Sequence, residues 1–137
     1  MPIEVYSRAR DGSRALSADF CVKEFACHDG SDPVFVDSAL VDTLQTIRDH
    51  FGQPVHITSG YRTARHNSAV GGTAYSQHLY GRAADIQIDG VDAASVAAYA
   101  ETLLPNTGGI GLYAPNAARV KGWVHLDVRP VKARWKG

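Results

Sequence analysis

Apolar residues recur at helical spacing in two segments of the chain, residues 38–51 and residues 92–104. The apolar face of the first segment consists of Leu40, Leu44, Ile47 and Phe51, and that of the second consists of Val96, Tyr99, Ala100 and Leu103. This spacing is typical of amphipathic helices. Asp37 can cap the start of the first segment and Gly52 can end it, so the pattern predicts a helix in each segment.

Four short runs with β-branched or alternating apolar residues predict strands, at residues 54–58, 83–88, 109–113 and 123–128. Residues 1–35 show neither period and are predicted to be irregular, with 1–19 as an extension of a single domain over 1–137. Residues 59–77 are predicted to be mainly loop. Helices and strands alternate too irregularly for a doubly wound parallel sheet. The order predicts an α+β fold, with the helices packed on one face of a small, mostly antiparallel sheet.

The two longest predicted strands carry polar residues at alternating positions. Asp85 lies between apolar positions in the strand at 83–88, and His125 and Asp127 do so in the strand at 123–128. Because side chains alternate across a strand, the apolar sets face the helices and these three polar side chains share the opposite, open face. A histidine and two aspartates on one face indicate a site.

A second histidine, His78, lies seven residues before Asp85 in the chain. Gly81 permits a sharp turn between them, so the loop can bring His78 over the strand. Together with His125, these residues form a set of two imidazoles and one carboxylate. That set is typical of a catalytic zinc ion with one position left for water. On spacing alone, histidines that only form hydrogen bonds remain an equally open interpretation.

The overall composition narrows the function only weakly. The 137 residues carry 14 Lys and Arg and 14 Asp and Glu, and this zero net charge argues against a nucleic-acid binder. No run reaches the roughly 18 apolar residues of a membrane span. Cys21 and Cys27 are compatible with a disulfide or with two partly buried thiols.

Several segments together resemble a known family. Residues 76–85 (SQHLYGRAAD) resemble the S-x-H-x-x-G-x-A-x-D signature of the M15 zinc peptidases. Residues 59–62 (SGYR), 67–72 (NSAVGG) and 123–127 (WVHLD) resemble further motifs of that family, in the same order. Residues 24–27 (EFAC) resemble the entry of the branch that is common in phages and prophages. The resemblance covers almost the whole chain, about residues 20–135.

The resemblance implies a fold shared with peptidoglycan carboxypeptidases and the Hedgehog signalling domain. It implies that His78, Asp85 and His125 hold one Zn²⁺ ion and that Arg62 contacts the substrate. A guanidinium can grip a carboxylate or steady the charge of a tetrahedral intermediate. We expect Ser76 to hydrogen-bond the substrate or to orient its loop.

Aromatic residues are candidates for the lining of the cleft, although simple packing explains each of them equally well. They are Tyr61, which we also expect to contact the substrate, and Tyr113 and Trp135.

The chain departs from the family at the general base. Many relatives carry an acidic residue or a histidine two or three positions before the last ligand, where this chain has Gly122 and Trp123. Asp127, on the same face as His125, is our candidate for the base. The alternative is that Asp127 hydrogen-bonds one of the metal ligands and holds it in position. Other candidates that the sequence does not place are His28, His56, His66 and Asp32.

These features predict a zinc peptidase that cleaves a peptide bond in the stem peptides or cross-links of peptidoglycan. The alternative is a zinc-bearing module that binds the wall or a virion without turnover. The polar N-terminus lacks the apolar stretch of a secretory signal. We therefore expect a phage or prophage lysin, which stays in the cytoplasm at synthesis and acts on the wall after release. A virion-associated hydrolase is the other expected setting. We expect no stable membrane insertion. The cleaved bond, carboxypeptidase or endopeptidase action and the oligomeric state stay open.

Overall fold

A five-stranded sheet organises most of the chain in the computed structural model, which describes residues 3–137. The strands follow the spatial order β3-β4-β6-β5-β7, and all neighbours are antiparallel except the parallel pair of β5 and β7. The strands are β3 (Val55–Ser59), β4 (Ala83–Ile88), β5 (Gly109–Tyr113), β6 (Trp123–Asp127) and β7 (Ala133–Lys136). The predicted α+β class and all four predicted strands are confirmed, whereas β7 was not predicted.

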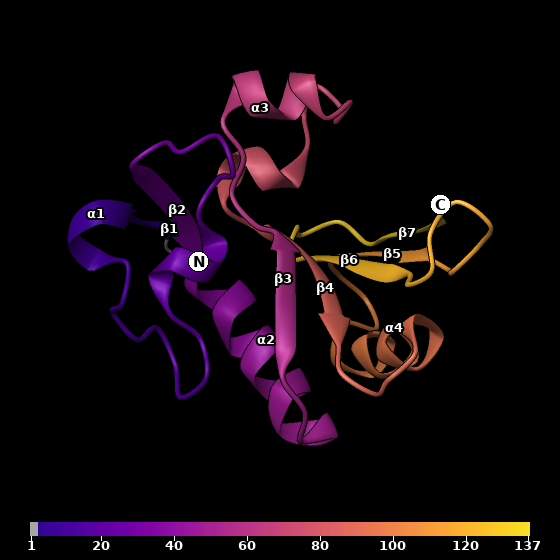
Figure 1. Ribbon diagram of the computed structural model, residues 1–137. Helices are drawn as coiled ribbons and strands as arrows, with labels where there is room; N and C mark the ends of the chain where they lie inside the picture. Colours follow the sequence, from indigo (N-terminus) through magenta and orange to yellow (C-terminus); the bar gives the residue numbers. More distant parts are fainter. Residues whose placement is uncertain (1–2) are drawn as a thin grey trace.

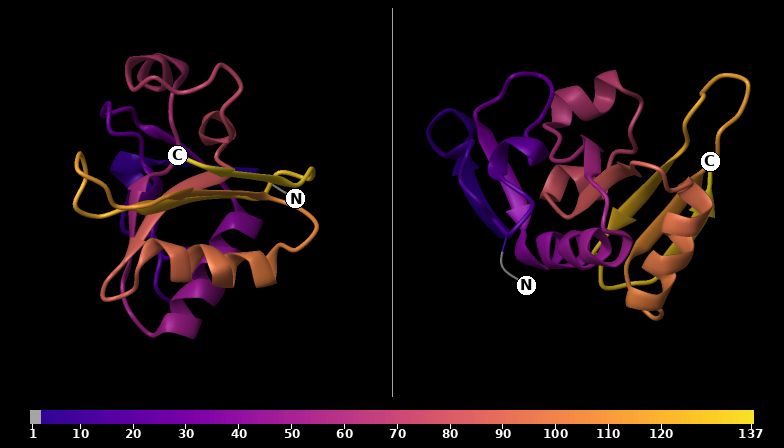
Figure 2. Two further views of the ribbon diagram at one scale, coloured as in Figure 1. Left: turned by 90° about the vertical axis from the view of Figure 1, so that its right-hand side faces the viewer. Right: turned by 60° about the horizontal axis from the view of Figure 1, so that its bottom comes forward.

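The two long helices, α2 (Ser38–Phe51) and α4 (Ala93–Leu103), cover one face of this sheet, as Figure 2 (left) shows. Both match the predicted helices closely. Asp37 caps α2 by accepting a hydrogen bond from the Ala39 N–H at 2.9 Å, and Gly52 ends it with a φ of 64°. The core between helices and sheet is built from the side chains that the pattern placed there, among them Leu44, Ile47, Val96, Ile86, Val124 and Leu126.

The N-terminal part is more ordered than the sequence indicated. β1 (Ile3–Ser7) pairs antiparallel with β2 (Pro33–Asp37) in a two-stranded sheet, and the short helices α1 (Arg8–Asp11) and η1 (Val22–Phe25) lie between them in the chain (Figure 1). The prediction of an irregular segment was therefore wrong, except for residues 1–2, which lie outside the described part. Ile3 and Val5 of β1 remain exposed and only Tyr6 packs against the core, so this strand lacks the buried alternation that identifies a strand from sequence.

The segment between β3 and β4 lies on the other side of the five-stranded sheet from α2 and α4 (Figure 2, left). It contains two short helices, α3 (Ala64–Ala69), which lies within the stretch 59–77 that we predicted to be mainly loop, and η2 (Gln77–Tyr80), which begins at its end. The open face of β4, β6 and β5 thus forms the floor beneath this segment. In the described part of the chain, no helix has the length and apolar character needed to cross a membrane.

Candidate metal centre

His78, Asp85 and His125 come together where η2 meets the open face of the sheet. Each offers one possible ligand atom, and these three atoms lie within 4.8 Å of one another. Asp85 on β4 and His125 on β6 are direct partners in the strand register, and η2 brings His78 above them. The sequence predicted Asp85 and His125 on one face with His78 brought over it by a loop, and the structure brings the three into a single buried cluster.

The turn after η2 explains how His78 reaches this position. Ser76 caps the short helix by accepting a hydrogen bond from the His78 N–H at 3.2 Å. Gly81 then adopts a φ of 71°, which residues with a Cβ atom rarely adopt. Its backbone also packs so closely on Phe35 that an added Cβ atom would collide with the Phe35 backbone. The sharp turn expected at Gly81 is confirmed, and it directs the chain from His78 into β4.

Hydrogen bonds fix which nitrogen of each imidazole faces the centre. The Nδ1 atom of His78 lies 2.7 Å from the Gly60 carbonyl oxygen, which can only accept, so Nδ1 carries the proton and Nε2 faces Asp85. The Nε2 atom of His125 donates to an Asp127 carboxylate oxygen at 2.7 Å, which leaves Nδ1 facing Asp85 at 3.1 Å. Both rings therefore direct an electron pair toward the same carboxylate.

This convergence of acceptors suits a cation between them. Burial alone would lower the pKa of His125, but its hydrogen bonds with Asp127 and Asp85 outweigh burial and raise that pKa. Burial alone would raise the pKa of Asp85, yet hydrogen bonds with His125 and His78 hold it well below its usual range. Both shifts favour a proton between His125 Nδ1 and Asp85, and a divalent ion at the same place would compete with that proton. Two imidazoles and one carboxylate suit zinc.

Asp127 lies behind His125 and away from the cleft. Its side chain is 0% exposed and accepts five hydrogen bonds, from the backbone N–H groups of Gly109 and Arg129, from two nitrogens of the Arg129 guanidinium and from His125. These bonds hold the pKa of Asp127 well below its usual range, although burial opposes them. A base has to contact water in the cleft, so the geometry does not support the expected role of Asp127 as general base. It favours the alternative, a carboxylate that orients a ligand.

Arg62 reaches the centre from the other side. Its guanidinium donates to the Ser59 hydroxyl at 3.0 Å, to the Asn67 side-chain oxygen at 3.2 Å and to the second carboxylate oxygen of Asp85 at 3.4 Å. These contacts hold the arginine at the edge of the cleft and turn the first oxygen of Asp85 toward the two histidines. The placement agrees with a cationic group beside the reacting bond, which is the role that we expect for Arg62.

The centre opens into a cleft of about 550 Å³. Its lining includes Arg62 and Ser76, our candidates for contact with the substrate, and Tyr113 and Trp135, our aromatic candidates for the lining. Trp123 and Arg129 line it as well. Tyr61 is not part of this lining, because its ring packs against Phe35 at a centroid distance of 5.1 Å, and the expected substrate contact is not supported. Arg129 was not among the predicted site residues, and its only signal in the sequence is its position two residues after Asp127.

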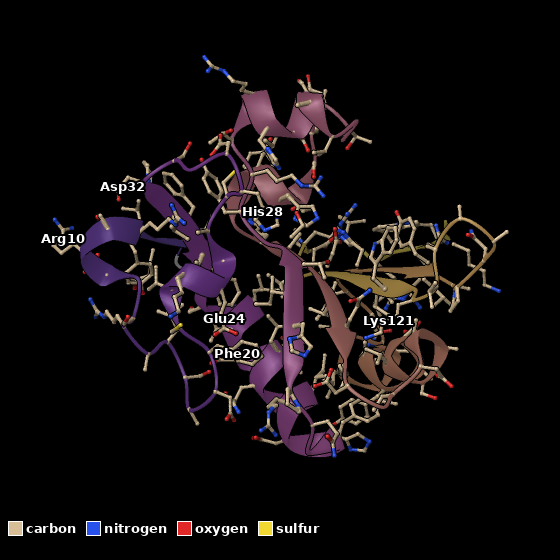
Figure 3. All side chains as sticks on the ribbon, in the orientation of Figure 1. Arg10, Phe20, Glu24, His28, Asp32 and Lys121 are labelled. Carbon is tan, nitrogen blue, oxygen red and sulfur yellow. The ribbon has the colours of Figure 1, made fainter. Side chains whose placement is uncertain are left out.

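The other candidate bases lie elsewhere. His56 is exposed and pairs with Asp89 at 2.9 Å. His28 faces His66, with the ring centroids 6.1 Å apart, and Asp32 lies beside α1, far from β5 and β6 (Figure 3). Among residues 3–137, the only carboxylate that lines the cleft is that of Asp85.

Comparisons with known proteins agree with this geometry. A family model described as Peptidase M15 matches residues 17–127, which include all three clustered residues and Arg62. The chain is also similar to a probable peptidoglycan L,D-endopeptidase, MepK, of Haemophilus influenzae. The two are 33% identical over 110 residues, which cover 74% of this chain and 55% of that protein. The chain therefore spans about half the length of this curated relative.

Proposed function

This chain belongs to the M15 peptidase family, and we propose that it hydrolyses a peptide bond in peptidoglycan with one zinc ion held by His78, Asp85 and His125. The observation that carries the proposal is the convergence of two oriented imidazoles and a carboxylate at the base of an open cleft. The similarity to a probable peptidoglycan endopeptidase supports the choice of substrate.

Different residues of the cleft would have different roles in the hydrolysis. When bound, zinc supplies a Lewis acid that polarises a carbonyl group and makes water a better nucleophile at neutral pH. Arg62 can donate its remaining N–H groups to a substrate carboxylate or to the oxygen that becomes negative during attack. Asp127 keeps His125 in the tautomer that presents Nδ1. We assign no general base, since Asp85 is the only cleft carboxylate in the described residues.

That missing base also favours a second candidate, a zinc-bearing module that binds the wall without turnover. The two candidates differ in what purified peptidoglycan would release. A peptidase frees new amino and carboxyl termini, which mass spectrometry identifies together with the bond that is cut. A chelator should abolish this release and added zinc should restore it. A binding module would sediment with the wall and release nothing under either condition, and that result would refute the proposed hydrolysis.

We further propose a lysin-type setting, in which the chain acts on the wall once the membrane is open. This setting has a test of its own, separate from the test of the chemistry. Producing the chain inside bacteria, with and without a membrane-permeabilising agent, should give lysis only with the agent. Lysis without it would contradict the proposed setting and leave the proposed chemistry untouched.

A further inference from the structure

One wall of the cleft is aromatic. We use the term aromatic wall for Tyr113 on β5, Trp123 on β6 and Trp135 on β7, all of which line the cleft. Tyr113 and Trp123 are direct partners in the strand register, and their rings stack at a centroid distance of 4.6 Å and an angle of 8°. These large apolar surfaces lie beside the metal centre, where the proposed chemistry of bond cleavage does not use them.

The aromatic wall is held rigidly and reaches the metal centre. The Trp135 indole N–H donates to the Tyr113 hydroxyl at 2.9 Å, which links the edge strand β7 to its neighbour β5. Trp135 lies across the bare backbone of Gly111, where a Cβ atom would collide with the indole. Its ring centroid is 4.9 Å from that of His125. The wall is therefore continuous with the proposed site, and a ligand on it would extend away from the reacting bond.

Arginine side chains border the aromatic wall and can serve as hydrogen-bond donors. The Arg119 guanidinium lies 4.8 Å from the Trp123 ring centroid, and Arg129 lies 5.4 Å from that of Trp135. Arg119 is fixed by hydrogen bonds to the carbonyl oxygens of Ala114 and Gly137. Tyr113 and Arg119 each lie over the Trp123 ring, so a ligand would contact the part of these half-buried rings that still lines the cleft. Apolar ring surface next to donors suits a ligand ring with C–H groups on its faces and oxygen atoms at its edge, and a pyranose sugar has this chemistry.

We propose that the aromatic wall binds a sugar ring of the glycan strand, so that the chain prefers stem peptides that are still attached to sugar. This inference rests on the proposed function, because it assumes a peptidoglycan peptide at the metal centre. The opposite side of the cleft carries Arg62, Ser76 and Gln77, whose polar groups suit the peptide. Trp123 lies two residues from His125, about 7 Å along the strand, so sugar and reacting bond fit side by side.

The first test compares two substrates that carry the same peptide. One is a stem peptide on its disaccharide, and the other is that peptide after an amidase has removed the sugar. We expect kcat/KM to favour the sugar-bearing substrate roughly tenfold, the effect of one stacked ring. Trp123→Leu should bring this ratio close to one. The control is Tyr6→Leu in the two-stranded sheet, away from the cleft. It also removes an aromatic ring that has an arginine over it, Arg14 at 5.4 Å, and should leave the ratio of the two kcat/KM values unchanged.

The second test measures sugar binding without hydrolysis, on the wild-type chain without metal. An N-acetylglucosamine tetramer is titrated while NMR follows the indole N–H signals of the two tryptophans. Shifts of the Trp123 signal that saturate would support the proposal. Unchanged signals, or equal cleavage of the two substrates by the wild-type chain, would overturn it. Absence of cleavage on both substrates with zinc present would instead count against the proposed function, and the titration would still decide sugar binding.

Discussion

Replacing Asp127 with asparagine separates the two roles that the sequence left open for this residue. The carboxylate accepts five hydrogen bonds and donates none, and it holds the Nε2 proton of His125. An asparagine amide directs an NH₂ group at one set of these donors, whichever way it is turned. Three of the five donors point at one carboxylate oxygen, so the amide oxygen should take that position and the NH₂ group should face His125. In this orientation asparagine favours the other tautomer of His125, with the proton on Nδ1 where the metal should bind. We therefore expect Asp127→Asn to weaken metal binding.

The structure indicates the size of this effect. Loss of a carboxylate that orients a histidine ligand typically weakens metal affinity by roughly 10- to 100-fold, or about 1.4 to 2.7 kcal/mol. The upper part of this range applies here, because Asp127 is fully buried and water cannot replace the lost acceptor. At least one buried N–H also loses its partner, so the free energy of unfolding of the metal-free chain should fall by about 1–3 kcal/mol.

The assay is a zinc titration of peptide release and of metal binding by the same samples. If Asp127 positions His125, Asp127→Asn needs more zinc and regains most of its kcat at saturation. Asp89→Asn is the matched control, because Asp89 pairs with His56 at 2.9 Å on the exposed surface. It should leave the zinc titration unchanged. Unaltered zinc affinity with kcat lost at every zinc concentration would refute our reasoning and restore Asp127 as the general base.

Three further predictions follow from the same geometry. His125→Ala should lose zinc binding and peptide release together, and a variant that stays inactive while binding zinc normally would contradict the ligand role. Gly109→Ala should lower the free energy of unfolding, measured by urea denaturation, by about 1–3 kcal/mol, because the added Cβ atom collides with the Asp127 carboxylate. Unchanged stability would contradict this, because it would mean that the strands move apart to fit the Cβ atom at no cost. Because the pKa of His125 is raised, the metal-free chain should lose stability as pH rises from about 6.5 through that raised pKa. Above that pKa zinc no longer competes with the proton, so zinc should raise Tm more at the higher pH. An increase in Tm with zinc that does not depend on pH would contradict this competition between zinc and the proton.

The parts of the fold that repeat a simple period could be predicted from the sequence. α2 and α4 each bury one stripe, and apolar and polar residues alternate along the sequences of β4 and β6. That alternation also placed Asp85 and His125 on one surface before any pairing was known. Their direct pairing across two strands required the register, which depends on contacts along the whole sheet.

The parts that depend on neighbours far apart in the chain could not be predicted. β1 buries little, and β7 is a four-residue edge strand whose pairing with β5 leaves no periodic signal. The role of Asp127 depends in the same way on Gly109 and Arg129, which surround its carboxylate. A polar residue two positions from a ligand looks the same in sequence whether it faces the cleft or lies beneath that ligand.

The two histidines are held by different kinds of acceptor, and this difference limits how the site can vary. His78 donates to the backbone carbonyl of Gly60, which no change of side chain removes. His125 donates to the side chain of Asp127, which in turn depends on its contacts with Arg129 and with the N–H of Gly109. Substitutions can therefore weaken the orientation of His125 far more easily than that of His78. Changes that adjust metal affinity without removing a ligand should thus be found around Asp127.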